Sequence, residues 1–151
     1  YRWGRGFQQG QGQNRKRYLA GALDAATRRL TWVEGERKTS ALFCQLLWRL
    51  PAAYPKARRI HIILDNYIIH TSKITKRCVA SLGGRVVLHF LPPYSPDDNR
   101  IEAAVWTPMH KDVTYNHTES RIQSLAANVK GWLTRTDRRA LSGVAESRKA
   151  V

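Results

Sequence analysis

Two acidic residues of this sequence, Asp65 and Glu102, stand where carboxylates could bind a metal ion. Asp65 directly follows an apolar run, residues 60–64, that has the length of a buried strand. Side chains at the C-terminal ends of parallel strands face the crevice where α/β proteins place their sites. Glu102 follows a proline-rich loop and lies in the first turn of an expected helix. Because carboxylates alone select hard cations such as Mg²⁺ or Mn²⁺, the pair is our candidate catalytic and metal-binding site.

Each carboxylate also has a simpler explanation. Asp65-Asn66 is favourable turn chemistry, and Glu102 near a helix N-terminus gains about 0.3–1 kcal/mol from the helix dipole. Glu102, however, would lie beside the apolar stripe that docks on the sheet, formed by Ile101, Val105, Met109 and Val113. A metal explains a carboxylate there better than solvent does. Two ions about 4 Å apart could activate the attacking oxygen and stabilise the leaving oxygen in phosphoryl transfer.

The charge balance indicates a phosphate-rich partner. The 151 residues contain 26 Lys and Arg against 11 Asp and Glu, a formal net charge of +15. Nucleic acid is the partner that such basicity favours, although a solubility surplus or a ribosome-associated protein would share it. No apolar run approaches transmembrane length, so no membrane partner is expected. Candidate DNA contacts are His70, Lys73, Lys76, Arg77 and Arg100, with His70 otherwise expected at the surface or as a cap.

Hydrophobic periodicity predicts the element order β-β-α-β-α-β-α-α. Strands are expected at residues 18–23, 30–33, 60–64 and 85–91, the first two as an antiparallel hairpin and the last two parallel. Helices are expected from Thr39 or Ser40, closed by Pro51 and Pro55, then over residues 72–82 with Ile74 in the apolar stripe, over 99–115, and from Thr118. Together these elements form an α/β fold, a mixed sheet with helices on its faces.

The length fits one domain with two polar ends. Residues 1–16 read as a polar basic arm or loop that begins like a cut edge. Residues 17–135 carry the periodic elements, and residues 136–151 read as a basic C-terminal tail. Cys44 and Cys78 have no metal-ligand spacing and are expected as buried free thiols.

The sequence resembles the DDE transposases, and more narrowly the bacterial insertion-sequence branch of the mariner-like superfamily. Residues 63–70 read ILDNYIIH, and residues 90–102, followed by Trp106, read FLPPYSPDDNRIE. The resemblance implies an RNase H-like catalytic domain, with Asp65 as the second acid and Glu102 as the third. It also implies two Mg²⁺ or Mn²⁺ ions, cleavage of transposon ends and strand transfer into target DNA. A homodimer in the bacterial cytoplasm, associated with the nucleoid, completes the implied picture.

The departures from the family pattern concern its first acid. No residue matches it, because Asp24, the only acid before Glu34, falls in the hairpin connection. The family's first strand is central in the sheet, so its loss would leave the hairpin and the strand at 60–64 without the partner between them. The N-terminal helix-turn-helix region is not matched either, and Pro108 is unusual inside a helix. We therefore expect a transposase fragment that is inactive alone.

Two alternatives remain at this level. The chain could serve as a non-catalytic basic module, derived from a transposase, that binds DNA or dimerises. It could also belong to a related RNase H-like nuclease or resolvase, against which the Pro-Pro-Tyr-Ser-Pro loop argues.

Overall fold

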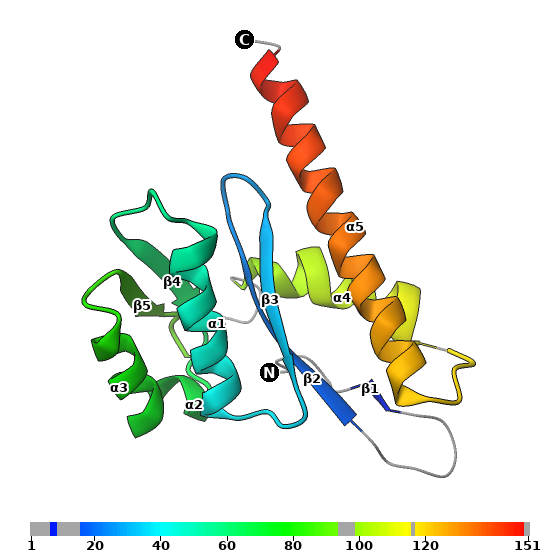
Figure 1. Cartoon of the computed structure of the whole chain (residues 1–151), viewed down its shortest axis with the longest axis horizontal. Helices are drawn as coiled ribbons and strands as arrows, with labels where there is room; N and C mark the ends of the chain where they lie inside the picture. Colours follow the sequence, from blue (N-terminus) through cyan, green and yellow to red (C-terminus); the bar gives the residue numbers. More distant parts are fainter. Residues whose placement is uncertain (1–6, 9–15, 94–98, 116, 150–151) are drawn as a thin grey trace.

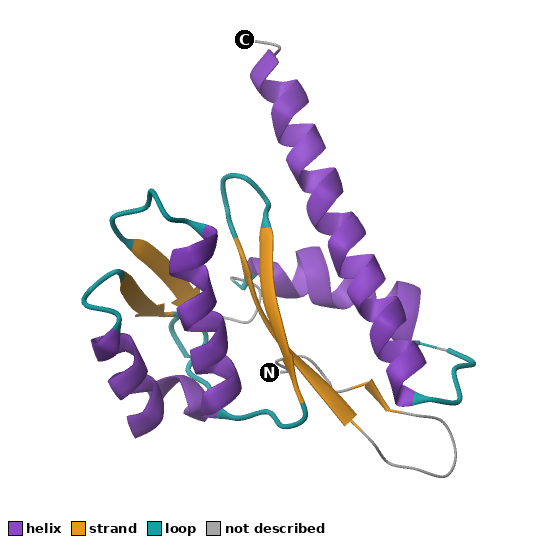
Figure 2. Cartoon of the chain, in the orientation of Figure 1, coloured by secondary structure: helices purple, strands orange, loops and turns teal. Residues whose placement is uncertain are grey.

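The computed structural model describes residues 7–8, 16–93, 99–115 and 117–149, with side chains described between residues 16 and 137. Most of the predicted N-terminal arm and the loop at residues 94–98 therefore lie outside the described residues. The architecture is α/β, as predicted, with helices packed on small sheets (Figures 1 and 2).

The strands form two sheets in the described part of the chain. One has the order β1-β2-β3, from β1 (Phe7–Gln8), β2 (Lys16–Leu23) and β3 (Leu30–Gly35), all antiparallel. The other pairs β4 (Ile60–Leu64) with β5 (Val86–Phe90) in parallel. The predicted hairpin and parallel pair are confirmed. No ladder between described residues joins β2 to β4.

Side-chain caps begin two of the helices at their predicted residues. Thr39 Oγ1 accepts from Leu42 N at the start of α1 (Ser40–Ala53), and Ser72 Oγ accepts from Thr75 N at the start of α3 (Lys73–Ser81). Of the two prolines predicted to close α1, Pro51 lies inside the helix, which ends at Ala53, two residues before Pro55. Between β4 and α3 lies a single-turn helix that was not predicted, α2 (Ile68–Thr71).

The last helix of the chain is longer than predicted. The helix α5 (Ile122–Lys149) begins after Thr118 and continues through most of the segment predicted as a basic tail. Its weak periodicity beyond residue 134 concealed this continuation. Among the described residues, no helix combines the length and apolarity needed to span a bilayer.

The expected helix at residues 99–115 is present but irregular. It comprises the π-helical turn η2 (Glu102–Trp106), the short α4 (Thr107–Met109) and a second π-helical turn, η3 (His110–Thr114). Pro108 lies between the two wide turns and has no N–H to donate. Wide π turns are a recognised accommodation inside helices and occur often at functional sites.

The β2–β3 hairpin is a shared middle layer. Alternate residues of β2 point to opposite faces: Leu19 joins a core with α5 and the η2–α4 segment, whereas Ala20 joins a core with α1. The α1 core also contains Leu64 of β4 and Val86 of β5. A single helix therefore covers both sheets, which fixes their relative position although their strands do not pair.

The η2 segment approaches β2 very closely at Gly21. A Cβ atom at Gly21 would lie 2.9 Å from a ring carbon of Trp106. Trp106 is buried in the α5 core, with Val105 and Met109 beside it. Glycine in β2 thus permits the contact that seats the Glu102 segment on the sheet.

The packing of α1 against α3 contains both cysteines. Cys44 and Cys78 are buried and free, as predicted, and Cys78 Sγ lies 4.0 Å from the Cys44 carbonyl oxygen. Ile74, in contrast, is 57% exposed, so its predicted place in the apolar stripe of α3 is wrong. Thr75 takes the buried position instead, with its hydroxyl donating to the Ile69 carbonyl.

Candidate active site

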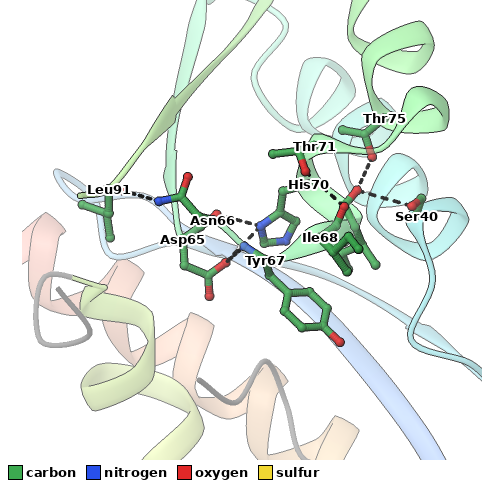
Figure 3. Close-up of polar contacts among 10 residues, drawn as sticks. Ser40, Asp65, Asn66, Tyr67, Ile68, His70, Thr71, Thr75 and Leu91 are labelled. Carbon is green, nitrogen blue, oxygen red and sulfur yellow. Dashed lines mark hydrogen bonds and ion pairs between the residues drawn. The ribbon is translucent and has the colours of Figure 1, made fainter. Parts of the chain in front are cut away.

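Asp65 lies at the C-terminal end of β4, where the strand leaves the α1 core. Two hydrogen bonds fix this end: Leu91 N donates to Leu64 O at 2.8 Å, and Asn66 Nδ2 donates to Leu91 O at 2.6 Å (Figure 3). The Asp65 side chain is 24% exposed, and its Oδ1 accepts from Tyr67 N at 3.1 Å. The turn role considered for Asp65 is therefore real, and it orients the carboxylate.

His70 supports Asp65 from the interior. Its Nδ1 lies 3.0 Å from Asp65 Oδ1 and 3.0 Å from the Asp65 carbonyl oxygen, so the hydrogen belongs on Nδ1 because both neighbours are acceptors (Figure 3). The ring is 1% exposed and packs on Phe43, with centroids 4.5 Å apart. The expectation of a surface His70 is wrong, and an enclosed ring is unsuited to the DNA contact assigned to it.

The unpredicted helix α2 explains why His70 turns inward. It brings the ring under Asp65, and hydroxyl groups hold the helix in place (Figure 3). Thr75 Oγ1 donates to Ile69 O at 2.5 Å, and Ser40 Oγ donates to the same carbonyl oxygen at 3.3 Å. These bonds connect α2 to α3 and α1, so the support of Asp65 is continuous with the helical layer.

Glu102 lies in the first turn of η2 and is electrostatically coupled to Asp65. Its N–H donates to Asn99 O at 3.0 Å, and the buried Trp106 anchors the same turn. Burial and the negative charge of Asp65 together raise the pKa of Glu102 to about 7, against the opposing positive charge of Lys38. The two predicted ligands, remote in sequence, are therefore brought together by the fold.

Lys38 is a site residue that the sequence did not reveal. It lies between β3 and α1, with its Nζ 3.9 Å from the centre of the Tyr67 ring, and its charge acts on Glu102. Tyr67 is two positions beyond Asp65, so the cation sits beside the carboxylate pair. No local motif marks it, because only the packing of α1 on β4 brings the two segments together.

The other candidate DNA contacts are at the surface. Lys73, Lys76 and Arg77 are exposed on α3, and Arg100 is exposed just before Glu102. Their exposure is compatible with phosphate contacts, and their role remains a prediction.

Asp24 has a structural role at the hairpin turn. Its Oδ1 accepts from Ala26 N at 2.8 Å and from Thr27 N at 3.1 Å. Burial alone would raise the pKa of Asp24, but the hydrogen bonds from Thr27 and Ala26 outweigh it and hold the pKa below its usual value. This geometry agrees with leaving Asp24 out of the candidate acids.

The donor chemistry of the pair fits a hard divalent cation. Two carboxylates raise each other's electrostatic cost, and a cation between them would remove that cost. Within the described residues, no group of three or more His, Cys, Asp or Glu side chains could hold a metal. The described site is thus a pair of acids with Lys38 beside it.

Comparisons with known proteins identify the family of the chain and its fold. The family described as DDE superfamily endonuclease matches residues 5–126. The chain is 40% identical over 122 residues to the insertion element IS630 uncharacterized 39 kDa protein of Shigella sonnei, a match that covers 81% of the chain and 35% of the relative. The chain therefore spans about a third of the length of that relative.

Solved structures show the same fold at low sequence identity. The catalytic domain of Mos1 mariner transposase matches with a TM-score of 0.62 and 18% identity, over 87% of this chain and 70% of that one. The Mos1 paired end complex with Mn matches with a TM-score of 0.59 and 19% identity, over 92% and 44%. A chain of the simian T-cell lymphotropic virus intasome matches with a TM-score of 0.58 and 19% identity, over 83% and 44%.

The fold is accordingly that of the RNase H-like catalytic domains of transposases and integrases. The family match spans most of the sequence, including both Asp65 and Glu102. The chain belongs to the DDE superfamily of endonucleases.

Proposed function

We propose that the chain is part of a DDE transposase that cleaves transposon ends and transfers the strands to target DNA, with Asp65 and Glu102 as metal ligands. The observation that carries the proposal is the electrostatic coupling of these two carboxylates, which come from different elements and lie close enough for the charge of Asp65 to raise the pKa of Glu102. Mg²⁺ or Mn²⁺ is the proposed cofactor, two ions in the complete site. Solved Mos1 structures that contain Mg and Mn support this choice by analogy of fold.

Each residue of the proposed site has a separate role. Asp65 is oriented by Tyr67 N and by His70, which makes His70 a positioning residue. Glu102 is held by the turn that Trp106 anchors. Lys38 balances part of the negative charge before metal binding. A divalent ion bound by the carboxylates would supply Lewis-acid stabilisation of charge on a phosphoryl oxygen.

A third acid belongs, in this proposal, to a strand that pairs with both β2 and β4. The support is geometric: among the residues that the structure describes, β4 pairs on one side only, and residues 18–23 of β2 pair only with β3. Since α1 covers both sheets, a strand between them would continue the same layer. Its end would lie near Asp65 at the end of β4. Without that strand, we propose, the 151-residue chain does not cleave DNA.

Metal-dependent stabilisation and cleavage test the proposal separately. Mg²⁺ should raise the melting temperature of the wild-type chain, because a ligand that binds only the folded state stabilises it. D65N and E102Q should abolish that response. The chain alone should leave supercoiled plasmid intact in Mg²⁺ or Mn²⁺. Cleavage by the wild-type chain that D65N abolishes would refute the missing third acid, and an unchanged Mg²⁺ response in both variants would refute the site.

The non-catalytic alternative rests on charge. Lys73, Lys76 and Arg77 form an exposed basic surface on α3, within a chain of net charge +15. A basic module would bind DNA with an affinity that falls steeply with salt concentration. Neither added metal nor the D65N/E102Q substitutions would change that affinity. Binding that strengthens with Mg²⁺ only when both acids are present would favour the transposase instead.

The remaining expectations follow the same proposal. Transposon ends and target DNA are the partners, and a homodimer is the working unit of the complete protein. Its place would be the bacterial cytoplasm, at the nucleoid.

A further inference from the structure

Two histidines meet on the outer face of the β4–β5 sheet, the face opposite to the one that packs against the α1 core. His61 Nδ1 lies 2.9 Å from His89 Nε2, and the ring centroids are 5.1 Å apart. Both side chains are exposed. His61 is in register with Val87, and Ile63 is in register with His89, so the two histidines are diagonal neighbours on one face.

The opposite face of the same strands is the one that packs. Ile62 and Leu88 contact the α1 core, and Leu64 and Val86 are buried in it. On the outer face, Ile63 is 66% exposed. The His61–His89 contact therefore does not result from enclosure by the core. Both rings can rotate without disturbing the packing of the core.

The distance between the nitrogens suits chelation of one metal ion. For metal–nitrogen bonds of about 2.0–2.1 Å, nitrogens 2.9 Å apart subtend an angle of about 90° at the metal. Adjacent ligands at that angle are typical of square-planar or tetragonal Cu²⁺ and Ni²⁺, whereas tetrahedral Zn²⁺ needs a wider separation. Imidazole nitrogen is also a preferred ligand of these ions, unlike of Mg²⁺.

Each imidazole ring can keep its one N–H hydrogen when a metal ion binds. In the present contact one neutral ring donates its N–H to the other ring. When a metal ion binds between the two contacting nitrogens, the donating ring must move its hydrogen to its other nitrogen. Since both rings are exposed, water can serve the second nitrogen of each.

We infer that His61 and His89 form a two-histidine site for a late first-row transition metal ion, Cu²⁺ or Ni²⁺, that bridges β4 and β5. The site is separate in ligand type from the Asp65–Glu102 pair and does not depend on the proposed transposase function. The remaining coordination positions would be filled by water on the exposed face.

Calorimetric titration of the untagged 151-residue chain with NiCl₂, in a non-coordinating buffer, tests the site. We expect a single saturable Ni²⁺ site that H61Q and H89Q each remove. H117Q deletes a histidine elsewhere and should retain the site, as should D65N/E102Q, which removes the carboxylate pair. The inference would be overturned if Ni²⁺ still bound to H61Q or H89Q. It would also be overturned if H117Q or D65N/E102Q removed the binding.

A second measurement avoids any dependence on the folding of variants. Electron paramagnetic resonance of Cu²⁺ added to the wild-type chain, at less than one equivalent, reports the number of coordinating imidazole nitrogens. Two are expected, and one or none would contradict the bridging site. Saturating NiCl₂ should also raise the melting temperature, since the ion would bind only when β4 and β5 are paired.

Discussion

Replacing Glu102 by Gln should stabilise the metal-free chain at neutral and alkaline pH. In the folded state, burial and the charge of Asp65 make the ionised Glu102 unfavourable and raise its pKa from an ordinary 4.5 to about 7. Glutamine has nearly the same shape but no charge to desolvate. The variant therefore removes an electrostatic cost and keeps the packing of the η2 turn.

The magnitude follows from the pKa difference between the two states. Raising the pKa from 4.5 to about 7 corresponds to about 3 kcal/mol, at 1.36 kcal/mol per pH unit. Because Glu102 is only partly buried, solvent screening reduces the effect, and we expect about 1–2 kcal/mol. For a chain of this size, that free energy corresponds to about 2–8 °C in melting temperature.

The pH dependence has a definite sign. Below about pH 4.5, Glu102 is protonated in both the folded and the unfolded chain, so E102Q gains nothing from this group. As the pH rises towards 7, the unfolded wild type releases the proton first, and its folded state loses stability relative to the variant. Above about pH 7 the advantage of E102Q is complete and constant.

Thermal melts of wild type and E102Q from pH 4 to 9, in EDTA, measure this difference. Glu36 provides the control, because its side chain is 80% exposed and E36Q should change stability by less than about 0.5 kcal/mol. Equal melting temperatures at pH 8, or an advantage of E102Q that grows towards acid, would refute the reasoning. Added Mg²⁺ should reverse the order, since only the wild type retains both carboxylates.

Three further outcomes follow from the structure. K38Q should raise the pKa of Glu102 further, which the carboxyl ¹³C chemical shift of Glu102 would report during an NMR titration. Gly21→Ala should lower stability by about 1–3 kcal/mol in denaturant melts, because the new methyl group would lie 2.9 Å from the Trp106 ring. Cys78 should resist alkylation by iodoacetamide at pH 8 until the chain unfolds, since burial raises its pKa to about 12; rapid modification of the native chain would contradict its placement.

Local patterns were sufficient for most of the fold. The strand at residues 60–64 was predicted with its observed bounds, because its apolar run is both short and bounded by polar residues. Thr39 and Ser72 begin their helices through hydrogen bonds within four residues of chain, which sequence can encode. The length of α5 was missed because its second half has no regular apolar face, so periodicity gave no signal there.

The candidate site was predictable only in part. Asp65 and Glu102 were found from strand ends, a helix start and a family motif. The inward turn of His70 depends on α2, a single helical turn held by contacts with α1 and α3 that no local pattern specifies. Lys38 reaches the site through tertiary packing alone. In both cases the deciding contacts join segments distant in sequence.

The two acids are positioned by different sheets, and this separation links metal binding to the proposed strand between β2 and β4. Asp65 ends β4, whereas Glu102 is seated on β2 through Trp106 and Gly21. A strand between β2 and β4, or an ion between the acids, would favour the same relative position of the two sheets. The packing of α1 on both sheets already contributes to that position. A third carboxylate without metal would add to the electrostatic cost that already raises the pKa of Glu102 to about 7. With metal, the same carboxylate becomes a ligand, so each event must favour the other to an equal extent.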